Sequence, residues 1–384
     1  MAGYVFSVSK KGWGHFCAEN LTEGFFTPYA VELTSDMTNT KRKVLSKVLA
    51  ATFGDLVTMA PGDIVYFLSD RKLYGIGVAK QIGEDCKYDN YLNASALLPD
   101  DLAAPEEFLT TESPRARWVC FFEPSPHLFL KGVDMDDVLR YRPSAFKSLR
   151  AFEGVSFIKI DDEENRALKE FISLANEESY EDLARNTTSF DASVHERLAE
   201  MELAPYVLDI TQALRHTGNR GYVLSEMFIE ASLLQKISRK EVDALGNWDY
   251  CTHQLIASPF KPLEYIDKID VFGYRFSAHY EEEPKLITKY LLVELKKEKI
   301  NRAALQQTMQ YVDWVCNEYA SGDYSKIEAY VIGRDAVRDI TSIRDEVCQR
   351  SFIVESHPAQ PQRRSSMALI HYSIDDDDIN FSEM

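Results

Sequence analysis

An acidic and a basic side chain stand two residues apart inside an apolar stretch, TKYLLVELKK, at Thr288–Lys297. Side chains alternate faces along a strand, so Glu294 and Lys296 should share one face of it. A segment this apolar is typical of an interior strand that is covered on both sides. A carboxylate and an ammonium group are costly to bury there unless they serve each other, a metal ion or a ligand.

A second expected strand, Ile266–Phe276, carries Asp270 between two apolar residues, and the acidic connection that follows is typical of a hairpin loop. If the two strands pair, the carboxylates of Asp270 and Glu294 come within reach of one divalent ion. Hard oxygen ligands suit Mg²⁺ (or Mn²⁺), which takes one or two carboxylates from a protein and keeps several waters. The backbone carbonyl of Leu295 would complete such a set of ligands.

Helices are expected before and after this hairpin. Asn301–Tyr319 has apolar residues at helical spacing, and Gln307 and Tyr311 share one side of it. In the earlier helix, expected over Leu224–Ile237, Glu226 stacks on a second glutamate one turn later. Such a like-charge pair costs about 0.2–0.5 kcal/mol in a bare helix, which a metal ion or a nearby lysine would relieve.

This ordered set of residues resembles the PD-(D/E)XK nuclease superfamily. The stretch IDVFGYRF…LLVELKKEKINRAALQQTMQYVDWV is most similar to the nuclease domain of mismatch-specific and branch-specific DNA endonucleases, over the last third to two-fifths of the chain. The resemblance implies an α/β restriction-endonuclease-like fold and a Mg²⁺-dependent endodeoxyribonuclease. The catalytic residues that it carries over are Glu226, Asp270, Glu294, Lys296 and Gln307.

Within this resemblance, Lys296 would position the attacking water and offset the charge of the phosphate. Neighbouring carboxylates oppose the lowering of its pKa by burial, which favours positioning over a role as base. Gln307 would hold the lysine amine or the water, and Lys297 and Tyr311 would contact the substrate. The plain alternative for Glu294 and Lys296 is a cross-strand salt bridge on a solvated face.

The first 172 residues predict a separate α+β domain of short strands, with a hairpin turn at Ser69–Lys72. Its Gly-Asp before an apolar strand and its closing FIKI plus helix resemble the PUA-like β-barrels, which include EVE, YTH and ASCH domains. That resemblance implies a substrate-binding pocket for a nucleobase, often a modified one, built from stacked aromatics. Trp13, Tyr74 and Trp118 are the expected walls, although any one of them taken alone is more often a core or surface aromatic.

The domain organisation expected from these patterns has four parts. Residues 1–172 form the recognition domain, 173–215 a helical connector, 216–355 the nuclease domain and 356–384 a flexible acidic tail. The N-terminus lacks a signal-peptide layout, no apolar run approaches the length of a membrane span, and the six cysteines are scattered without C-x-x-C spacing. We therefore expect a cytoplasmic protein.

The formal charge of −18 opposes nucleic-acid binding, because affinity for a polyanion draws on lysine and arginine. A globally acidic protein still binds DNA where its basic residues gather in one groove. Lys296, Lys297 and Lys299 are one such group. DNA is the expected partner, with RNA left open.

Together, the two domains predict a modification-sensing restriction or antiviral defence endonuclease. If both strands are cut, we expect a homodimer, since one active site handles one strand, and partner proteins of a defence system are a further expected class of contact. Two alternatives stay open: a DNA-repair or structure-specific nuclease, and a non-catalytic adaptor that binds RNA or another nucleic acid. The sequence has no G-x-S-x-G motif and no Walker loop, which disfavours serine-hydrolase and ATP-driven chemistry.

Overall fold

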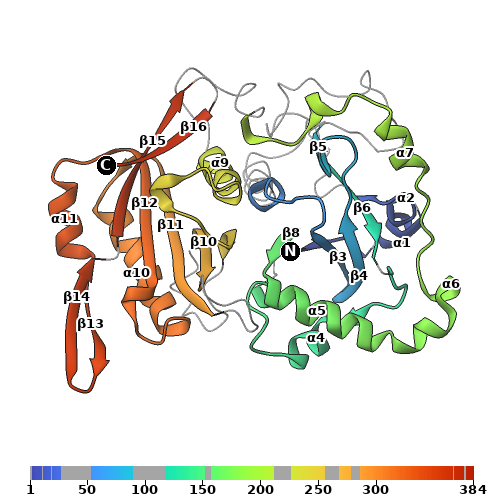
Figure 1. Ribbon diagram of the computed structural model, residues 1–384, viewed down its shortest axis with the longest axis horizontal. Helices are drawn as coiled ribbons and strands as arrows, with labels where there is room; N and C mark the ends of the chain where they lie inside the picture. The colour runs from blue at the N-terminus through green and yellow to red at the C-terminus, as the bar shows by residue number, and fades with distance from the viewer. Residues whose placement is uncertain are drawn as a thin grey trace, which may run out of the picture. The chain divides into compact units, whose positions relative to one another are not determined.

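The computed structural model describes residues 2–10, 12–18, 20–26, 53–89, 118–125, 127–151, 157–211, 226–255, 268–277, 286–365, 367–375 and 378–384. The chain divides into two compact units, Met1–His216 and Thr217–Met384, and each combines helices with a curled main sheet (Figure 1). The residues expected as a helical connector, 173–215, therefore belong to the N-terminal unit. Within the described ranges, no helix has both the length and the apolar character needed to cross a membrane.

The N-terminal unit is built on an eight-stranded sheet in the order β2-β6-β4-β3-β1-β8, with β5 paired to β6 and β7 to β4. The predicted hairpin is confirmed: β3 and β4 pair across a turn in which Asp70 and Arg71 have positive φ. The strands are β1 Gly3–Ser7, β2 Phe25–Phe26, β3 Ile64–Ser69, β4 Lys72–Ala79, β5 Lys87–Asp89, β6 Trp118–Pro124, β7 Val133–Asp134 and β8 Phe157–Ile160.

The helix α5 follows β8 directly, as the FIKI-plus-helix pattern predicts. Its N-cap, Asp161, accepts a hydrogen bond from the backbone of Glu164, which satisfies one of the open amides of the first turn. The helical segments of this unit are α1 Trp13–Ala18, α2 Asn20–Glu23, α4 Met135–Tyr141, η3 Leu149–Ala151, α5 Asp162–Ala175, η4 Glu177–Asp182, α6 Leu183–Asn186, α7 Ser193–Ala199 and η5 Ala204–Tyr206.

The C-terminal unit is built on a mixed six-stranded sheet in the order β16-β15-β12-β11-β10-β9. The predicted hairpin is confirmed, because β10 pairs antiparallel with β11 and Val271 lies opposite Val293. The strands β11, β12 and β15 run parallel to one another, so their carboxyl ends lie at one edge of the sheet. The strands are β9 Tyr250–Leu255, β10 Ile269–Phe276, β11 Ile287–Ile300, β12 Ile327–Ala336, β15 Met367–Asp375 and β16 Asp378–Glu383.

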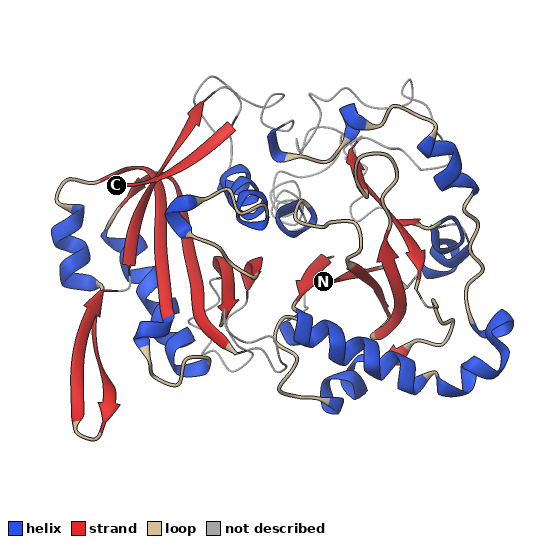
Figure 2. Ribbon diagram, in the orientation of Figure 1, coloured by secondary structure: helices blue, strands red, loops and turns tan. Residues whose placement is uncertain are grey.

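Helices cover both faces of this sheet (Figure 2). On one face, Leu292 of β11 packs with Leu305 and Met309 of α10, as the apolar stripe of that helix predicts. The helix α9 contacts β9, β10 and β11 on the other face. The helical segments are α9 Glu226–Ser238, η6 Asp243–Leu245, α10 Arg302–Glu318, η7 Tyr324–Lys326 and α11 Ile340–Val347.

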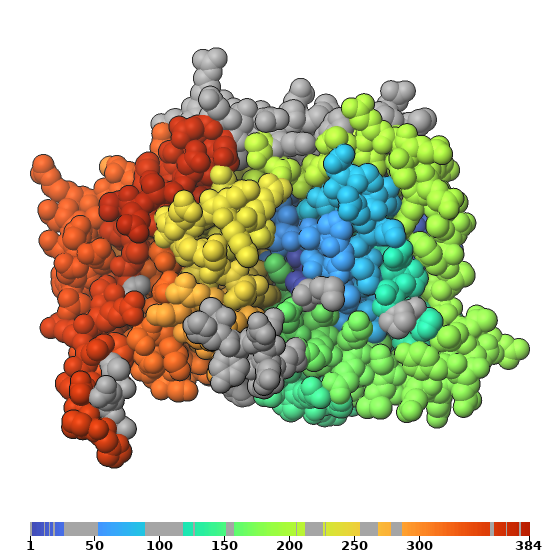
Figure 3. Space-filling view, viewed as in Figure 1, coloured from blue at the N-terminus to red at the C-terminus, as the bar shows by residue number. Residues whose placement is uncertain are grey.

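The expected flexible tail, residues 356–384, is largely sheet instead. β13 (Gln349–Ser356) and β14 (Ala359–Ser365) form a hairpin that stands out from the surface of its unit (Figure 3). β15 lies between β12 and β16, where Ile370 and Tyr372 are buried. The acidic run makes the last strand, β16, hard to predict from sequence, because Ile379 is the single buried residue of that strand.

Candidate functional site

The first functional side chain lies where β10 and β11 part. Beyond the pair Val271–Val293, the Oδ2 atom of Asp270 accepts a hydrogen bond from the backbone amide of Leu295 at 2.7 Å. The carboxylate thus takes the place that a backbone carbonyl of the neighbouring strand would occupy. The amide and the carbonyl of one strand residue point to the same side, so the Leu295 carbonyl is directed toward the same gap.

Glu294 and Lys296 form an ion pair on the face of β11 that also carries Leu292. The Nζ atom of Lys296 lies 2.5 Å from Oε1 of Glu294, whose side chain is only 2% exposed, against 28% for the lysine. The second oxygen of the glutamate, Oε2, is buried and has no hydrogen-bond partner among the described residues. The expected alternative, a salt bridge on a solvated face, does not describe a carboxylate with so little exposure.

The electrostatics of the three groups follow from this burial. Burial raises the pKa of Glu294 to about 8, the charge of Asp270 adds to the rise, and Lys296 opposes it. Burial also raises the pKa of Asp270 to about 6, against the opposing Leu295 amide and Lys296. Burial lowers the pKa of Lys296, but the charge and hydrogen bond of Glu294 outweigh it, so the net shift is upward. The positive charge of the Lys296 ammonium group alone therefore does not compensate for the two carboxylates.

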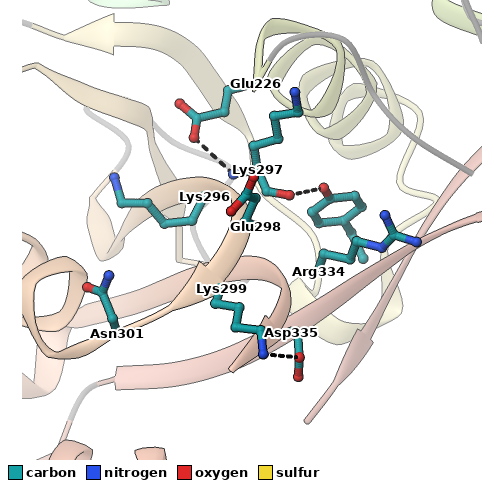
Figure 4. Close-up of a pocket in the computed structure, with 9 residues that line it drawn as sticks. Glu226, Lys296, Lys297, Glu298, Lys299, Asn301, Arg334 and Asp335 are labelled. Atoms are coloured by element: carbon teal, nitrogen blue, oxygen red, sulfur yellow. Dashed lines mark hydrogen bonds and ion pairs between the residues drawn. The ribbon is translucent and has the colours of Figure 1, made fainter. Parts of the chain in front are cut away.

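A cavity of about 900 Å³ lies beside this ion pair, at the carboxyl ends of the parallel strands. In open sheets with parallel strands, ligands bind outside these ends. Figure 4 shows side chains from three strands and from α9 around the cavity. The residues that line it are Glu226, Lys296, Lys297, Glu298, Lys299, Asn301, Arg334, Asp335 and Tyr372.

Glu226 enters the same cavity from the first turn of α9. Its Oε1 atom accepts a hydrogen bond from the backbone amide of Lys297 at 2.9 Å, and the side chain is exposed (Figure 4). The hydroxyl of Tyr372 donates to the carbonyl of the same lysine. The charge of Glu226 also contributes to the raised pKa of Asp270. The structure thus brings Glu226 close to the buried pair, with a contact to the backbone of β11.

Gln307 and Tyr311 lie differently from the expectation. The Nε2 atom of Gln307 donates to the Tyr311 hydroxyl at 3.1 Å, and that hydroxyl donates to the Lys268 carbonyl at 3.2 Å. Tyr311 is 2% exposed, which places its ring in the core and not on a surface for substrate. In the described contacts, the ammonium of Lys296 is held by Glu294 and not by Gln307. The helix α10 is thereby tied to the residue that precedes β10, next to Asp270.

The aromatics of the N-terminal unit separate into two places. The rings of Trp13 and Tyr74 are half-buried, with centroids 4.2 Å apart. Trp118 is 1% exposed and packs against Phe53, with ring centroids 5.2 Å apart. Trp118 is therefore a core residue, while Trp13 and Tyr74 remain candidates for a stacking surface. Trp13 is the first residue of α1.

Two residues that line the cavity, Arg334 and Tyr372, are not predicted from the sequence, and Lys299 is expected only as a member of a basic group. A signal was present for Arg334, because it ends the apolar run IEAYVIGR, where a parallel strand presents its last side chains. Across the described ranges, no group of three or more histidine, cysteine or acidic side chains is placed to hold a metal ion. Two carboxylates and a carbonyl are the smaller set that Mg²⁺ uses in many proteins.

Comparisons with known proteins leave the family open. No protein-family model and no curated protein matches the chain. Among solved structures, it is similar to protein Atu2648 from Agrobacterium tumefaciens, with 13% identity and a TM-score of 0.26, over 46% of this chain and 96% of that one. It is also similar to a hypothetical protein from Leishmania major, with 12% identity and a TM-score of 0.29, over 47% and 97% of the two chains. Likenesses this distant assign neither a fold family nor a function.

Proposed function

We propose that the C-terminal unit is a metal-dependent endonuclease that hydrolyses phosphodiester bonds of DNA. The observation that carries this proposal is the environment of Glu294: a 2% exposed carboxylate with one oxygen on the Lys296 ammonium and the other without a donor among the described residues. A second carboxylate, Asp270, adds to its raised pKa. Buried acids are stable when they pair with cations or coordinate metals, and one ammonium group shared by two carboxylates leaves room for a cation.

The donor set fits Mg²⁺ or Mn²⁺. Asp270, Glu294 and the carbonyl of Leu295 would hold the ion, since all three are hard oxygen donors, Asp270 is bonded to the Leu295 amide, and the charge of Asp270 acts on Glu294. When bound, such an ion supplies Lewis-acid stabilisation of the phosphate and lowers the pKa of a bound water.

The side chains of the protein have separate tasks in this proposal. The Lys296 ammonium, held by Glu294 and lining the cavity, offsets phosphate charge and orients the attacking water. It is already engaged as a cation, which supports positioning over proton abstraction. Gln307 and Tyr311 fix the start of β10, and with it the carboxylate of Asp270.

We also propose the finer family assignments as part of this function. The mixed sheet, with the antiparallel hairpin β10–β11 and with α10 leading into the parallel β12, supports a PD-(D/E)XK nuclease fold for the C-terminal unit. The curled eight-stranded sheet supports a PUA-like recognition domain for the N-terminal unit. Trp13 and Tyr74 are the half-buried aromatics that would stack on a base, and modification sensing in a cytoplasmic restriction or defence system is the proposed role.

The test is digestion of a panel of plain and modified DNA and RNA with Mg²⁺ or Mn²⁺. Wild-type protein should cut DNA, and Glu294→Gln and Asp270→Asn should each lose activity by about 100-fold or more, the scale of deleting one key electrostatic group. Glu164→Gln is the matched control, because Glu164 is an equally buried glutamate in the other unit. It should cut like the wild type.

The outcomes separate the parts of the proposal. Equal cutting of plain and modified DNA would remove the modification-sensing clause and leave a repair or structure-specific nuclease. Absence of cutting on every substrate with either metal, in a protein that still binds nucleic acid, would favour the non-catalytic adaptor.

A further inference from the structure

The end of β11 contains a β-bulge next to the candidate site. Lys296 pairs with Gly333 of β12, and the next pair is Lys299 with Asp335, so β11 advances three residues while β12 advances two. A bulge leaves one residue outside the ladder, bends the strand and redirects side chains, and bulges are frequent beside active sites. The positions between the two pairs are Lys297 and Glu298.

Separate elements hold this bulge in place. The Lys297 amide donates to Glu226 of α9 at 2.9 Å, and the Lys297 carbonyl accepts from Tyr372 of β15. On β12, a Cβ atom at Gly333 would lie 2.6 Å from Cγ1 of Ile300 and 3.3 Å from the Glu298 carbonyl, so only glycine lets the two strands approach this closely. The bulge is therefore a fixed feature of the fold and not a frayed strand end.

The bulge has a direct consequence for the cavity. Four consecutive residues of β11, at positions 296 to 299, line it, where a regular strand would turn every second side chain away. Arg334, the residue after Gly333, joins them from β12, and its side chain is exposed. In a protein of formal charge −18, this cavity is lined by four basic residues against three acidic ones, Glu226, Glu298 and Asp335.

The outer part of this cavity is available to an anion. Lys299 pairs with Asp335 at 3.2 Å, and both side chains are 62% exposed. Exposed ion pairs contribute about 0–1 kcal/mol, so a phosphate can replace the carboxylate at small cost. A guanidinium such as that of Arg334 can form two parallel hydrogen bonds with phosphate oxygens, which a lysine ammonium cannot do.

We propose that Lys299 and Arg334 form a second anion subsite, which binds the phosphate next to the one that is cut in the same nucleic-acid strand. This inference rests on the proposed endonuclease function. Lys296 serves the phosphate at the carboxylate pair, and the bulge places the second subsite farther along β11. The role is substrate positioning, because neither side chain contacts Asp270 or Glu294 in the described contacts.

The test uses the full-length protein, Mg²⁺ and a 5′-labelled oligonucleotide that the wild type cuts at a mapped position. Arg334→Ala should raise KM about 10-fold, the scale of a hydrogen bond to a charged group, and change kcat much less. Arg334→Lys should restore part of the loss. Arg363→Ala is the matched control, because Arg363 is an exposed arginine on β14 that does not line the cavity.

A neutral methylphosphonate linkage beside the cut site provides the second measurement. It should raise KM for the wild type by the same factor as Arg334→Ala and should add nothing in that variant. Equal KM for Arg334→Ala and Arg363→Ala, or an undiminished methylphosphonate effect in Arg334→Ala, would overturn the subsite while cleavage stands. A wild type that cuts no oligonucleotide would instead refute the endonuclease itself, and the subsite with it.

Discussion

Glu164 in the N-terminal unit and Glu294 in the C-terminal unit are alike in burial and in the direction of their pKa shift. Glu164 in the N-terminal unit is 0% exposed and Glu294 in the C-terminal unit 2% exposed. Burial raises the pKa of each to about 8, and each has an Oε2 atom without a hydrogen-bond partner among the described residues. A buried carboxyl group with a raised pKa is a common mark of a functional site, but structural networks perturb pKa values too.

The surroundings of the two glutamates separate their roles. Oε1 of Glu164 accepts hydrogen bonds from the backbone amides of Lys147 and Leu149, at 2.8 and 3.0 Å. The ammonium of Lys147 also pairs with Asp161 at 3.2 Å. Through its two backbone hydrogen bonds, Glu164 therefore braces the segment that contains residues 147 to 149. Oε1 of Glu294 holds instead the ammonium of a cavity-lining lysine. Access from a cavity, and not burial or pKa, distinguishes a candidate site from a brace.

The largest expected effect that tests this comparison is the pH dependence of stability from Glu164. Its pKa lies at about 8 in the folded protein, above the ordinary value of 4.5. A raised carboxyl pKa gives stability that is complete below pH 4.5 and declines as the pH rises through about 8. At about 1.4 kcal/mol per unit, the upper limit of the loss is about 5 kcal/mol. Glu164→Gln should flatten this slope.

Hydrogen exchange of the α5 amides between pH 5 and 8.5, corrected for intrinsic exchange rates, measures that slope in the N-terminal unit. Asp161 and Lys147, whose charges also act on this carboxyl group, are unchanged in the variant. A wild type and a variant with parallel slopes would show that Glu164 is ionised in the folded protein, and the likeness to Glu294 would then end.

Stabilisation by a bound metal ion should depend on Glu294 and not on Glu164, the reverse of the pH effect. If Asp270 and Glu294 hold a divalent ion, Mn²⁺ at 100 times its Kd should stabilise the C-terminal unit by about 2.7 kcal/mol. Thermal unfolding with and without Mn²⁺ measures this gain, which Glu294→Gln should lose and Glu164→Gln should keep. An equal gain in both variants would place the metal elsewhere.

The centre of the site could be predicted from sequence because its signals are local. The alternation of side chains along β11 predicts that Glu294 and Lys296 share one face of the strand. The apolar stripe of α10 predicts that this helix packs over that face. The pairing of β10 with β11 then follows from the hairpin loop. The position of Asp270, where the two strands separate, can therefore be predicted without information about more distant segments.

The parts that could not be predicted depend on contacts between distant segments. The bulge at Lys297 is held by Glu226, 71 residues away, and Tyr372, 75 residues away, and no local pattern specifies either bond. Tyr311 shares a side of its helix with Gln307, as expected, but only the fold shows that its hydroxyl meets the Lys268 carbonyl. An acidic run likewise hides β16, whose burial depends on pairing with β15.

The smallest expected effect concerns a brace within the candidate site itself. Tyr372 and Glu226 do for the backbone of Lys297 what Glu164 does for the amides of Lys147 and Leu149. Tyr372→Phe removes one hydrogen bond, worth about 0.5–1.5 kcal/mol, and loosens the bulge without removing a charge. KM for a cleaved oligonucleotide should therefore rise about 3-fold, with kcat nearly constant.

Tyr330→Phe is the control, since Tyr330 bonds Glu328 on the same strand and does not line the cavity. A fall in kcat for Tyr372→Phe, with KM unchanged, would mean that the phenol acts on the reacting groups. Tyr372 would then belong to the active site and would not have only a structural role.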